Sequence, residues 1–158
     1  MEQQIFYIGN QSILKYPKVA FLSSRQISSD AILKCLDWAT EQRDKGACVI
    51  SGFHSPLEKN VLHFLLKGSQ PVVLVLGRSL YTQIPEELNK PLAEKHLLIV
   101  SPVSQSIHRH TTASSLLRNK YIIDTADEIV FGSLDMNGSL YPLYKKALLD
   151  GKNVWKIS

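Results

Sequence analysis

No stretch of the sequence is apolar for long enough to cross a bilayer. The longest apolar run, residues 72–77, is far shorter than the roughly 20 residues that a membrane-spanning helix needs. The first residues carry neither a basic segment nor an apolar segment behind it, so we expect no signal peptide. Cysteine is scarce too. Cys35 and Cys48 both stand among apolar residues, which predicts reduced core side chains in a cytoplasmic protein rather than a disulfide framework.

The excess of positive charge is also small. Lysine and arginine number 18 against 14 aspartates and glutamates, which gives a formal net charge of +4, and the hydrophobic content of 44% excludes a disordered chain. This balance permits a polyanionic partner without requiring one. The sequence shows no low-complexity segment, linker or internal repeat, so we expect residues 1–158 to form a single domain.

What the chain does have is a series of short apolar runs that do not alternate with polar residues. Such runs are typical of strands that are covered on both faces, as in a parallel sheet. The runs are residues 19–22, 48–50, 72–76, 97–100, 128–131 and 154–157. One more strand is expected at residues 5–8, at an edge of the sheet.

Helical patterns lie between these runs. Ser55 and Glu58 form a capping-box pattern with Pro56 at the first helical position, which predicts a helix that stops near Gly68. Other helices are expected over residues 31–46, 116–126 and 140–149, and a weaker one over 85–95. Strands and helices that alternate with short connections predict an α/β fold: a doubly wound, mostly parallel, Rossmann-like sheet in a three-layer sandwich.

The loops that follow the strands are where open sheets of this kind bind ligands. These loops carry basic side chains and a single acid, Asp135, whereas the opposite edge of the sheet mixes both signs of charge. The basic residues are Arg25, Arg78, Arg109, His54, His108 and His110. The fold is therefore expected to gather the modest positive charge onto one rim.

The same rim is rich in small and hydroxylated residues. They are Ser23, Ser24, Ser51, Gly52, Gly77, Gly138 and Ser139. Small residues let a ligand approach the backbone, and helix starts offer unpaired N–H groups. Together with arginines they favour a phosphate group. The alternative is that the loops contain ordinary helix caps and solvated arginines.

Several short motifs resemble those of the DNA-processing protein A (DprA/Smf) family. Residues 6–10 (FYIGN) and 19–25 (VAFLSSR) are similar to its "LY-x-GN" segment and "VAIVGSR" strand. Residues 49–52 resemble the start of "VVSGLARGID", 73–77 resemble "AVLGxGL", 118–123 resemble "RNRIIAGLSD", and 138–140 resemble "SGSL". The motifs keep their order over nearly the whole chain.

This resemblance implies a Rossmann-like core that binds single-stranded DNA, has no catalytic residues and no cofactor, and helps to load a recombinase. It places the family's functional residues on Arg25, Ser51, Gly52, Arg118, Asn119 and Lys120. With the rim residues above, the predicted phosphate or nucleic-acid site therefore includes Ser23, Ser24, Gly77, Arg78, Gly138 and Ser139. A homodimer is a further possible assembly.

The chain also departs from the family pattern. The "GSR" glycine is Ser23, and the "GID" glycine and aspartate are Pro56 and Glu58. The aromatic residue expected three positions before Arg118 is Ser115, which removes a surface on which a base would stack.

Three groups of residues have competing interpretations. Residues 118–120 are expected near the start of a helix, where cations oppose the helix dipole, so a phosphate contact and a buried structural role are equally favoured for Arg118. Residues 108–110 (HRH) are a poor zinc signal and are expected to form a flexible basic loop. Among the tyrosines, Tyr81 is a better stacking candidate than Tyr141 or Tyr144.

An enzyme of this fold would need a general base or a nucleophile in the loops. Related proteins that cleave nucleoside monophosphates carry "PGGxGTxxE" after a late strand, and residues 132–141 lack that glutamate. A non-enzymatic nucleic-acid-binding domain is therefore predicted. One alternative is a sensor or hydrolase for a small nucleotide. The other is a degenerate domain that serves as a protein-interaction partner or a homodimer.

Overall fold

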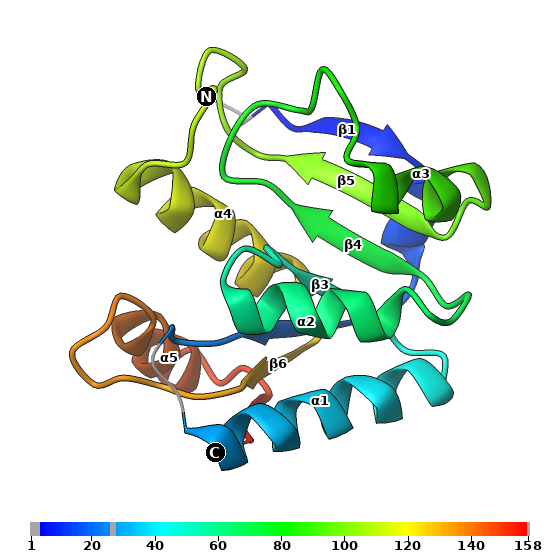
Figure 1. Cartoon of the computed structure of the whole chain (residues 1–158). Coiled ribbons are helices and arrows are strands. Elements are labelled where there is room, and N and C mark those ends of the chain that lie inside the picture. The colour runs from blue at the N-terminus through cyan, green and yellow to red at the C-terminus, as the bar shows by residue number, and fades with distance from the viewer. Residues whose placement is uncertain (1–3, 26–27, 158) are drawn as a thin grey trace.

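The computed structural model describes residues 4–25 and 28–157 (Figure 1). Its elements follow the expected alternation of strands and helices. In chain order they are β1 (Phe6–Gly9), the 3₁₀ helix η1 (Gln11–Lys15), β2 (Lys18–Leu22), α1 (Ser29–Asp44), β3 (Cys48–Ser51), α2 (Pro56–Leu65), β4 (Val72–Val75), α3 (Glu86–Ala93), β5 (Leu97–Ser101), α4 (Thr112–Thr125), β6 (Glu128–Phe131), α5 (Leu140–Leu149) and β7 (Val154–Lys156).

The strands form one seven-stranded sheet in the order β1-β5-β4-β3-β2-β6-β7. β1 runs antiparallel to β5 at one edge, and the other neighbouring strands are parallel. In the centre, Val19 of β2 pairs with Val49 of β3, and Ala20 pairs with Ile129 of β6. The predicted Rossmann-like, mostly parallel α/β fold and the edge position of the first strand are both confirmed.

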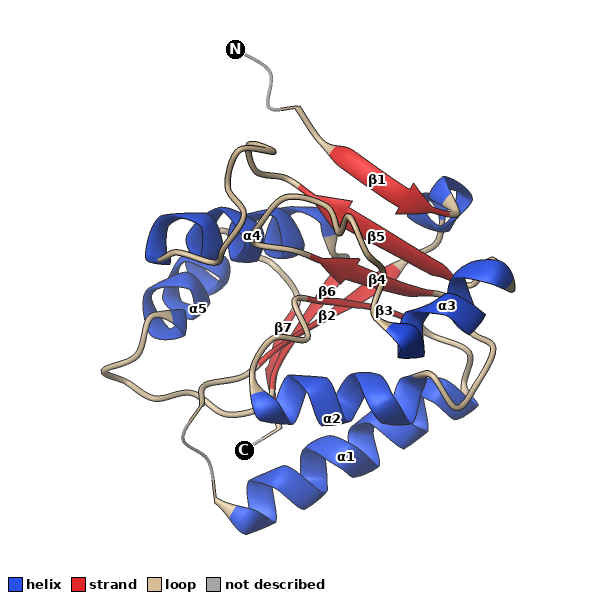
Figure 2. Ribbon diagram, turned by 45° about the horizontal axis from the view of Figure 1, so that its top comes forward, coloured by secondary structure: helices blue, strands red, loops and turns tan. Residues whose placement is uncertain are grey.

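Helices cover both faces of this sheet, which makes three layers (Figure 2). Side chains of α1, α2 and α3 pack with Phe21 and Val49 on one face. Side chains of η1, α4 and α5 pack with Ala20 and Ile50 on the other face. Because successive residues of a strand point to opposite faces, both sets must be apolar, which explains the absence of polar alternation in the runs.

The order of the strands changes direction at β2. The chain moves from β2 through β3 and β4 to β5 on one side, and β6 and β7 lie on the other side. At the carboxyl ends of β2 and β6, Ser24 N–H donates to the Ser133 carbonyl at 2.9 Å, and Asp135 N–H donates to Ser24 Oγ at 2.9 Å. These bonds tie the two exit loops together beside the crevice that such a switch point opens.

Both cysteines lie in the core, as expected. Cys35 and Cys48 are buried and free, and burial raises the pKa of each thiol to about 11. The capping box of Ser55 and Glu58 is present. Within the described ranges, no helix is long and apolar enough to cross a membrane.

One helix begins earlier than predicted. α4 starts at Thr112 rather than at residue 116, because Thr111 caps it: the Thr111 side chain accepts from Ser114 N–H, and the Ser114 hydroxyl accepts from Thr111 N–H. A serine takes the place of the usual acidic partner in this capping box. The prediction that Arg118 lies near the helix start was therefore wrong, because Arg118 lies in the second turn.

Candidate functional site

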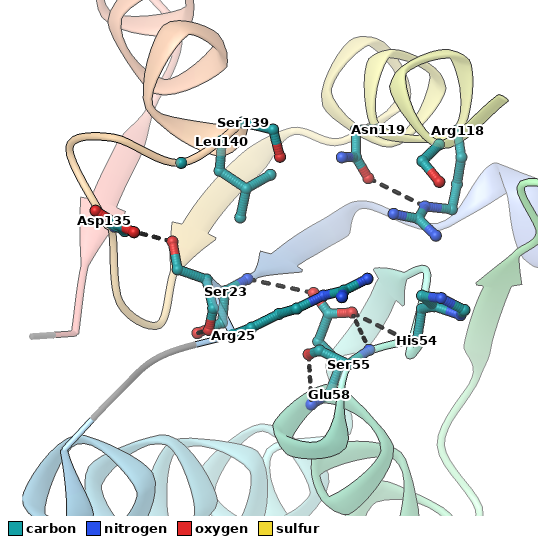
Figure 3. A pocket seen from close by; sticks show the side chains of 13 residues that line it. Ser23, Arg25, His54, Ser55, Glu58, Arg118, Asn119, Asp135, Ser139 and Leu140 are labelled. Atoms are coloured by element: carbon teal, nitrogen blue, oxygen red, sulfur yellow. Dashed lines mark hydrogen bonds between the residues drawn. The ribbon is translucent and has the colours of Figure 1, made fainter. Parts of the chain in front are cut away.

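A pocket of about 320 Å³ opens where β2, β3 and β6 end (Figure 3). Seven of the predicted site residues line it together: Ser23, Ser24, Arg25, Arg118, Asn119, Gly138 and Ser139. They come from the loops after β2 and β6 and from α4. The pocket therefore lies at the switch point of the sheet, where ligands of this architecture bind.

Arg118 supplies a buried cation to this pocket. Its side chain is only 8% exposed, and its Nε donates to Asn119 Oδ1 at 3.1 Å. Its Nη1 is buried without a hydrogen-bond partner among the described residues. Burial lowers the pKa of Arg118, an effect that the charge of Glu58 opposes. A guanidinium stays charged in proteins, so an unpaired buried donor of this kind is costly unless an anion reaches it.

Arg25 provides a second cation on the opposite side of the pocket. It is exposed, and Figure 3 shows its side chain extending over the pocket toward Glu58 and His54. In the described part of the chain, neither Arg25 nor Arg118 forms an ion pair with a carboxylate. The charge of Arg25 lowers the pKa of Arg118 further, which shows that the two cations repel. A bound anion would relieve that repulsion.

Glu58 corrects the expectation that Asp135 is the only acid of this rim. Glu58 lines the pocket and is 6% exposed. Its Oε2 accepts from Ser23 N–H at 3.2 Å, and its Oε1 accepts from His54 N–H at 3.0 Å and from Ser55 N–H at 3.2 Å. Its oxygens are thus engaged by three backbone donors, and the residue joins the end of β2 to the start of α2.

Two helix N-termini face the pocket, and they differ in how they are capped. The first turn of α2 is capped by its own Ser55 and Glu58. Ser139, at the start of α5, makes no side-chain capping bond to the residues that the structure describes. Tyr141 N–H donates to the Gly138 carbonyl at 3.4 Å and the next residue is a proline, so α5 offers an anion the N–H groups of Ser139 and Leu140 and its positive dipole end.

Two histidines form the wall beyond Arg118. The rings of His54 and His110 lie with centroids 4.2 Å apart, and Gly77 N–H donates to His110 Nε2 at 3.2 Å. Burial, with the nearby cations, lowers the pKa of His54, and the same causes lower the pKa of His110 to about 4. Both rings are therefore neutral at pH 7. His108 Nδ1 also lies 3.3 Å from Ser79 Oγ, so the basic loop at residues 108–110 makes contacts that the sequence did not indicate.

Acid should destabilise the protein between about pH 6.5 and pH 4 through His110. In the unfolded chain this imidazole has its usual pKa of 6.5, whereas in the folded protein it resists protonation down to about 4. The unfolded state binds more protons in this range, so stability falls as the pH falls. Urea unfolding across the range should show a smaller fall for His110→Gln, which keeps an acceptor for Gly77. His63→Gln, at an exposed site on α2, should lose as much stability as wild type. Equal losses of stability in all three proteins would contradict the role of His110 in the acid sensitivity.

Several predicted site residues lie outside the pocket. The Ser51 hydroxyl is buried and accepts from Phe53 N–H at 3.2 Å. Gly77 is held by His110, and Arg78 donates to the Ser79 carbonyl and lies over the Tyr81 ring at 5.4 Å. Lys120 is exposed on α4. None of these four residues lines the pocket.

Gly52 has a supporting position that the sequence did not indicate. A Cβ atom at this residue would lie 2.9 Å from both Cδ and Nε of Arg118. The missing side chain therefore leaves the space that the Arg118 side chain occupies.

Glu58 was visible as a capping residue, but no local signal showed that it would also contact the end of β2. Within the described ranges, no group of three or more His, Cys, Asp or Glu residues could hold a metal ion.

Comparison with known proteins identifies relatives along the whole chain. A family model described as DNA recombination-mediator protein A matches residues 2–157. The DNA processing protein DprA of Streptococcus pneumoniae is 23% identical over 158 residues, an alignment that covers 97% of this chain and 54% of that protein. The chain thus spans about half the length of this curated relative.

Two solved structures share the fold. One is DNA processing protein A from Helicobacter pylori, described with its single-stranded DNA binding mode. It has a TM-score of 0.77 and 20% identity over 96% of this chain and 70% of its own. The other is the Streptococcus pneumoniae protein, with the same TM-score and identity over 96% of this chain and 54% of its own. These likenesses confirm the fold.

Proposed function

Since this chain belongs to the DNA recombination-mediator protein A family, we propose that its switch-point pocket binds a backbone phosphate of single-stranded DNA. Arg118 carries the proposal, because it lines the pocket and forms no ion pair with a carboxylate among the described residues. Arg25 and the uncapped start of α5 complete the anion site. The Helicobacter pylori relative, which is described with single-stranded DNA, supports this choice of ligand. In this proposal the residues of the site hold the DNA strand and catalyse no reaction.

The salt dependence of binding tests the proposal. Fluorescence anisotropy with a labelled oligothymidylate should show affinity that falls steeply as salt rises, with a log–log slope of about −0.7 for each phosphate contact. Arg25→Gln should reduce the slope by about that amount. Lys45→Gln removes the same charge just after α1, at the other edge of the sheet, and should leave the slope unchanged. Binding that is undetectable at low salt would exclude the proposal.

The volume of the pocket also admits a single nucleotide, which is the second candidate function. Its 320 Å³ is within the lower range of small-molecule sites. Mononucleotides and cyclic nucleotides should then raise the midpoint of thermal unfolding and displace the oligonucleotide at similar concentrations. If the oligonucleotide binds and mononucleotides do not compete at comparable concentration, the strand is the ligand.

Gly52→Ala should weaken DNA binding without unfolding the protein. The new Cβ would force the flexible end of Arg118 to move out of its place, since 2.9 Å is too close for carbon. We expect a roughly tenfold loss of oligonucleotide affinity, the effect of one charged hydrogen bond. Gly68→Ala is the matched control, because its Cβ would press on the side chains of Gln70 and Arg43 at the opposite edge of the sheet. Equal affinities of the two variants would contradict the role of Gly52.

A further inference from the structure

His54 is a titratable residue of the switch-point pocket to which the proposed function gives no role. It follows β3 and lines the pocket together with Arg25 and Arg118. Figure 3 shows its ring on the side of the pocket where Arg118 lies. Its backbone N–H donates to Glu58, whereas its ring nitrogens make no hydrogen bond or ion pair with the residues that the structure describes. The ring is therefore available to an anion in the pocket.

The neighbouring ring of His110 leaves only one place for a proton on this pair. The two ring centroids lie 4.2 Å apart, so two positive charges would repel each other strongly. His110 Nε2 accepts from Gly77 N–H at 3.2 Å, and a proton on that nitrogen would set two donors against each other. No donor of the described chain occupies His54 in this way. A proton that reaches the pair is therefore expected on His54.

The charges around His54 depend on whether an anion is bound. Arg118, Lys59 and Arg25 add to the effect of burial and lower the pKa of His54. A phosphate between Arg25 and Arg118 would neutralise two of these three cations and would itself favour a positive ring. The pKa of His54 should therefore rise when the phosphate binds.

Carboxylates do not take over this role. The charged and titratable side chains that line the pocket or lie against His54 are Arg25 from the loop after β2, Glu58 and Lys59 from α2, His110 from the loop before α4, Arg118 from α4 and Asp135 from the loop after β6. Among the described residues, neither Glu58 nor Asp135 forms an ion pair with His54. The missing negative charge must come from the ligand.

We propose that His54 is a third phosphate-binding side chain of the switch-point pocket, and that it takes up a proton from the solvent as single-stranded DNA binds. This inference rests on the proposed function and adds a residue and a pH dependence to it. The complex holds the proton more tightly than the free protein, so affinity rises as the pH falls. The gain is complete below the pKa of His54 in the free protein, and it is lost as the pH rises through the pKa in the complex.

The test measures the binding of an oligothymidylate with hydroxyl ends from about pH 7.5 to about pH 5.5, where an imidazole titrates. Thymine and a phosphodiester do not titrate there, so a proton that is taken up belongs to the protein. At constant ionic strength, the affinity of wild type should rise about three- to tenfold more than that of His54→Gln. His63→Gln, on α2 and outside the switch-point pocket, should follow wild type. Calorimetry in two buffers of different ionisation enthalpy should show fewer protons taken up by His54→Gln.

Each outcome decides between this inference and the proposed function. If wild type binds in a salt-dependent way but gains no more from acid than His54→Gln, the inference is overturned and the phosphate pocket remains. If wild type does not bind the oligomer at low salt, both proposals fail together. A pH dependence that survives His54→Gln and disappears in His110→Gln would place the proton on the other ring and overturn the inference.

A measurement on wild type alone decides the matter should His54→Gln fail to fold. The ring proton resonances of His54 in the labelled protein report its protonation directly. Saturating oligothymidylate should raise the pH at the midpoint of their titration. A midpoint that is unchanged by bound oligothymidylate would overturn the inference.

Discussion

Replacing Arg118 by methionine should lower the affinity for single-stranded DNA about ten- to a hundredfold and leave the protein as stable as before or more stable. Arg118 is buried, and its Nη1 has no partner in the described part of the chain. Methionine keeps most of the apolar stem that lies against Gly52 and removes a desolvated charge. Glu58 keeps its three backbone donors, so no buried carboxylate is left unpaired. Anisotropy titrations and thermal unfolding measure the two effects.

Arg43→Met is the matched control for this experiment, and it should show the opposite result. Arg43 lies at the other edge of the sheet, and its Nη1 donates to the Phe64 carbonyl at 3.2 Å. Its loss should therefore lower the unfolding midpoint and leave DNA binding unchanged. If Arg118→Met also lowered the midpoint while binding stayed at the wild-type level, the buried guanidinium would have a structural role instead.

Glu58→Gln should lower the free energy of unfolding by about 2–4 kcal/mol. The carboxylate accepts from three backbone N–H groups through two oxygens, and it is 6% exposed. An amide has a single acceptor atom, so its NH₂ group would face at least one buried N–H that also donates. That donor loses its partner, and the remaining bonds lose the help of the negative charge. Urea unfolding with a fixed two-state analysis measures the change.

The control is Glu86→Gln, in the exposed first turn of α3. This change removes only a favourable interaction with the helix dipole, so we expect a loss under about 1 kcal/mol. A loss at Glu58 no larger than this would mean that the connection between β2 and α2 does not depend on the charged carboxylate. The end of β2 would then be held in place by Ser24 and its bonds to the loop after β6.

The prediction from sequence was most successful where the signals are local. A run of apolar residues such as 97–100 is typical of a strand that is covered on both faces, and β5 is found there. The proline and capping-box residues at the start of α2 mark that helix directly. The Thr111 cap of α4 was missed because serine replaces the acidic residue that usually completes the pattern.

Residue roles within α4 show why the candidate site was harder to predict. Arg118 and Lys120 are two positions apart, which is a rotation of about 200° around a helix. Arg118 is buried beside the pocket, and Lys120 is exposed. Which of the two faces inward depends on how α4 packs against the sheet. Residues 118–120 have the same sequence whichever of the two side chains faces inward, so the motif alone does not decide which one lines the pocket.

The sequence by itself determined the strands, the helices and their alternation, and with them the edge of the sheet at which a ligand would bind. It did so because periodicity, caps and strand exits depend on neighbours in the chain. Only the tertiary structure decided that Arg118 is buried with a donor that has no partner among the described residues, that Glu58 accepts from the N–H just after β2, and that His110 lies against His54. Residues 54 and 110 are far apart in the chain, and only packing around a common sheet could bring their rings to 4.2 Å.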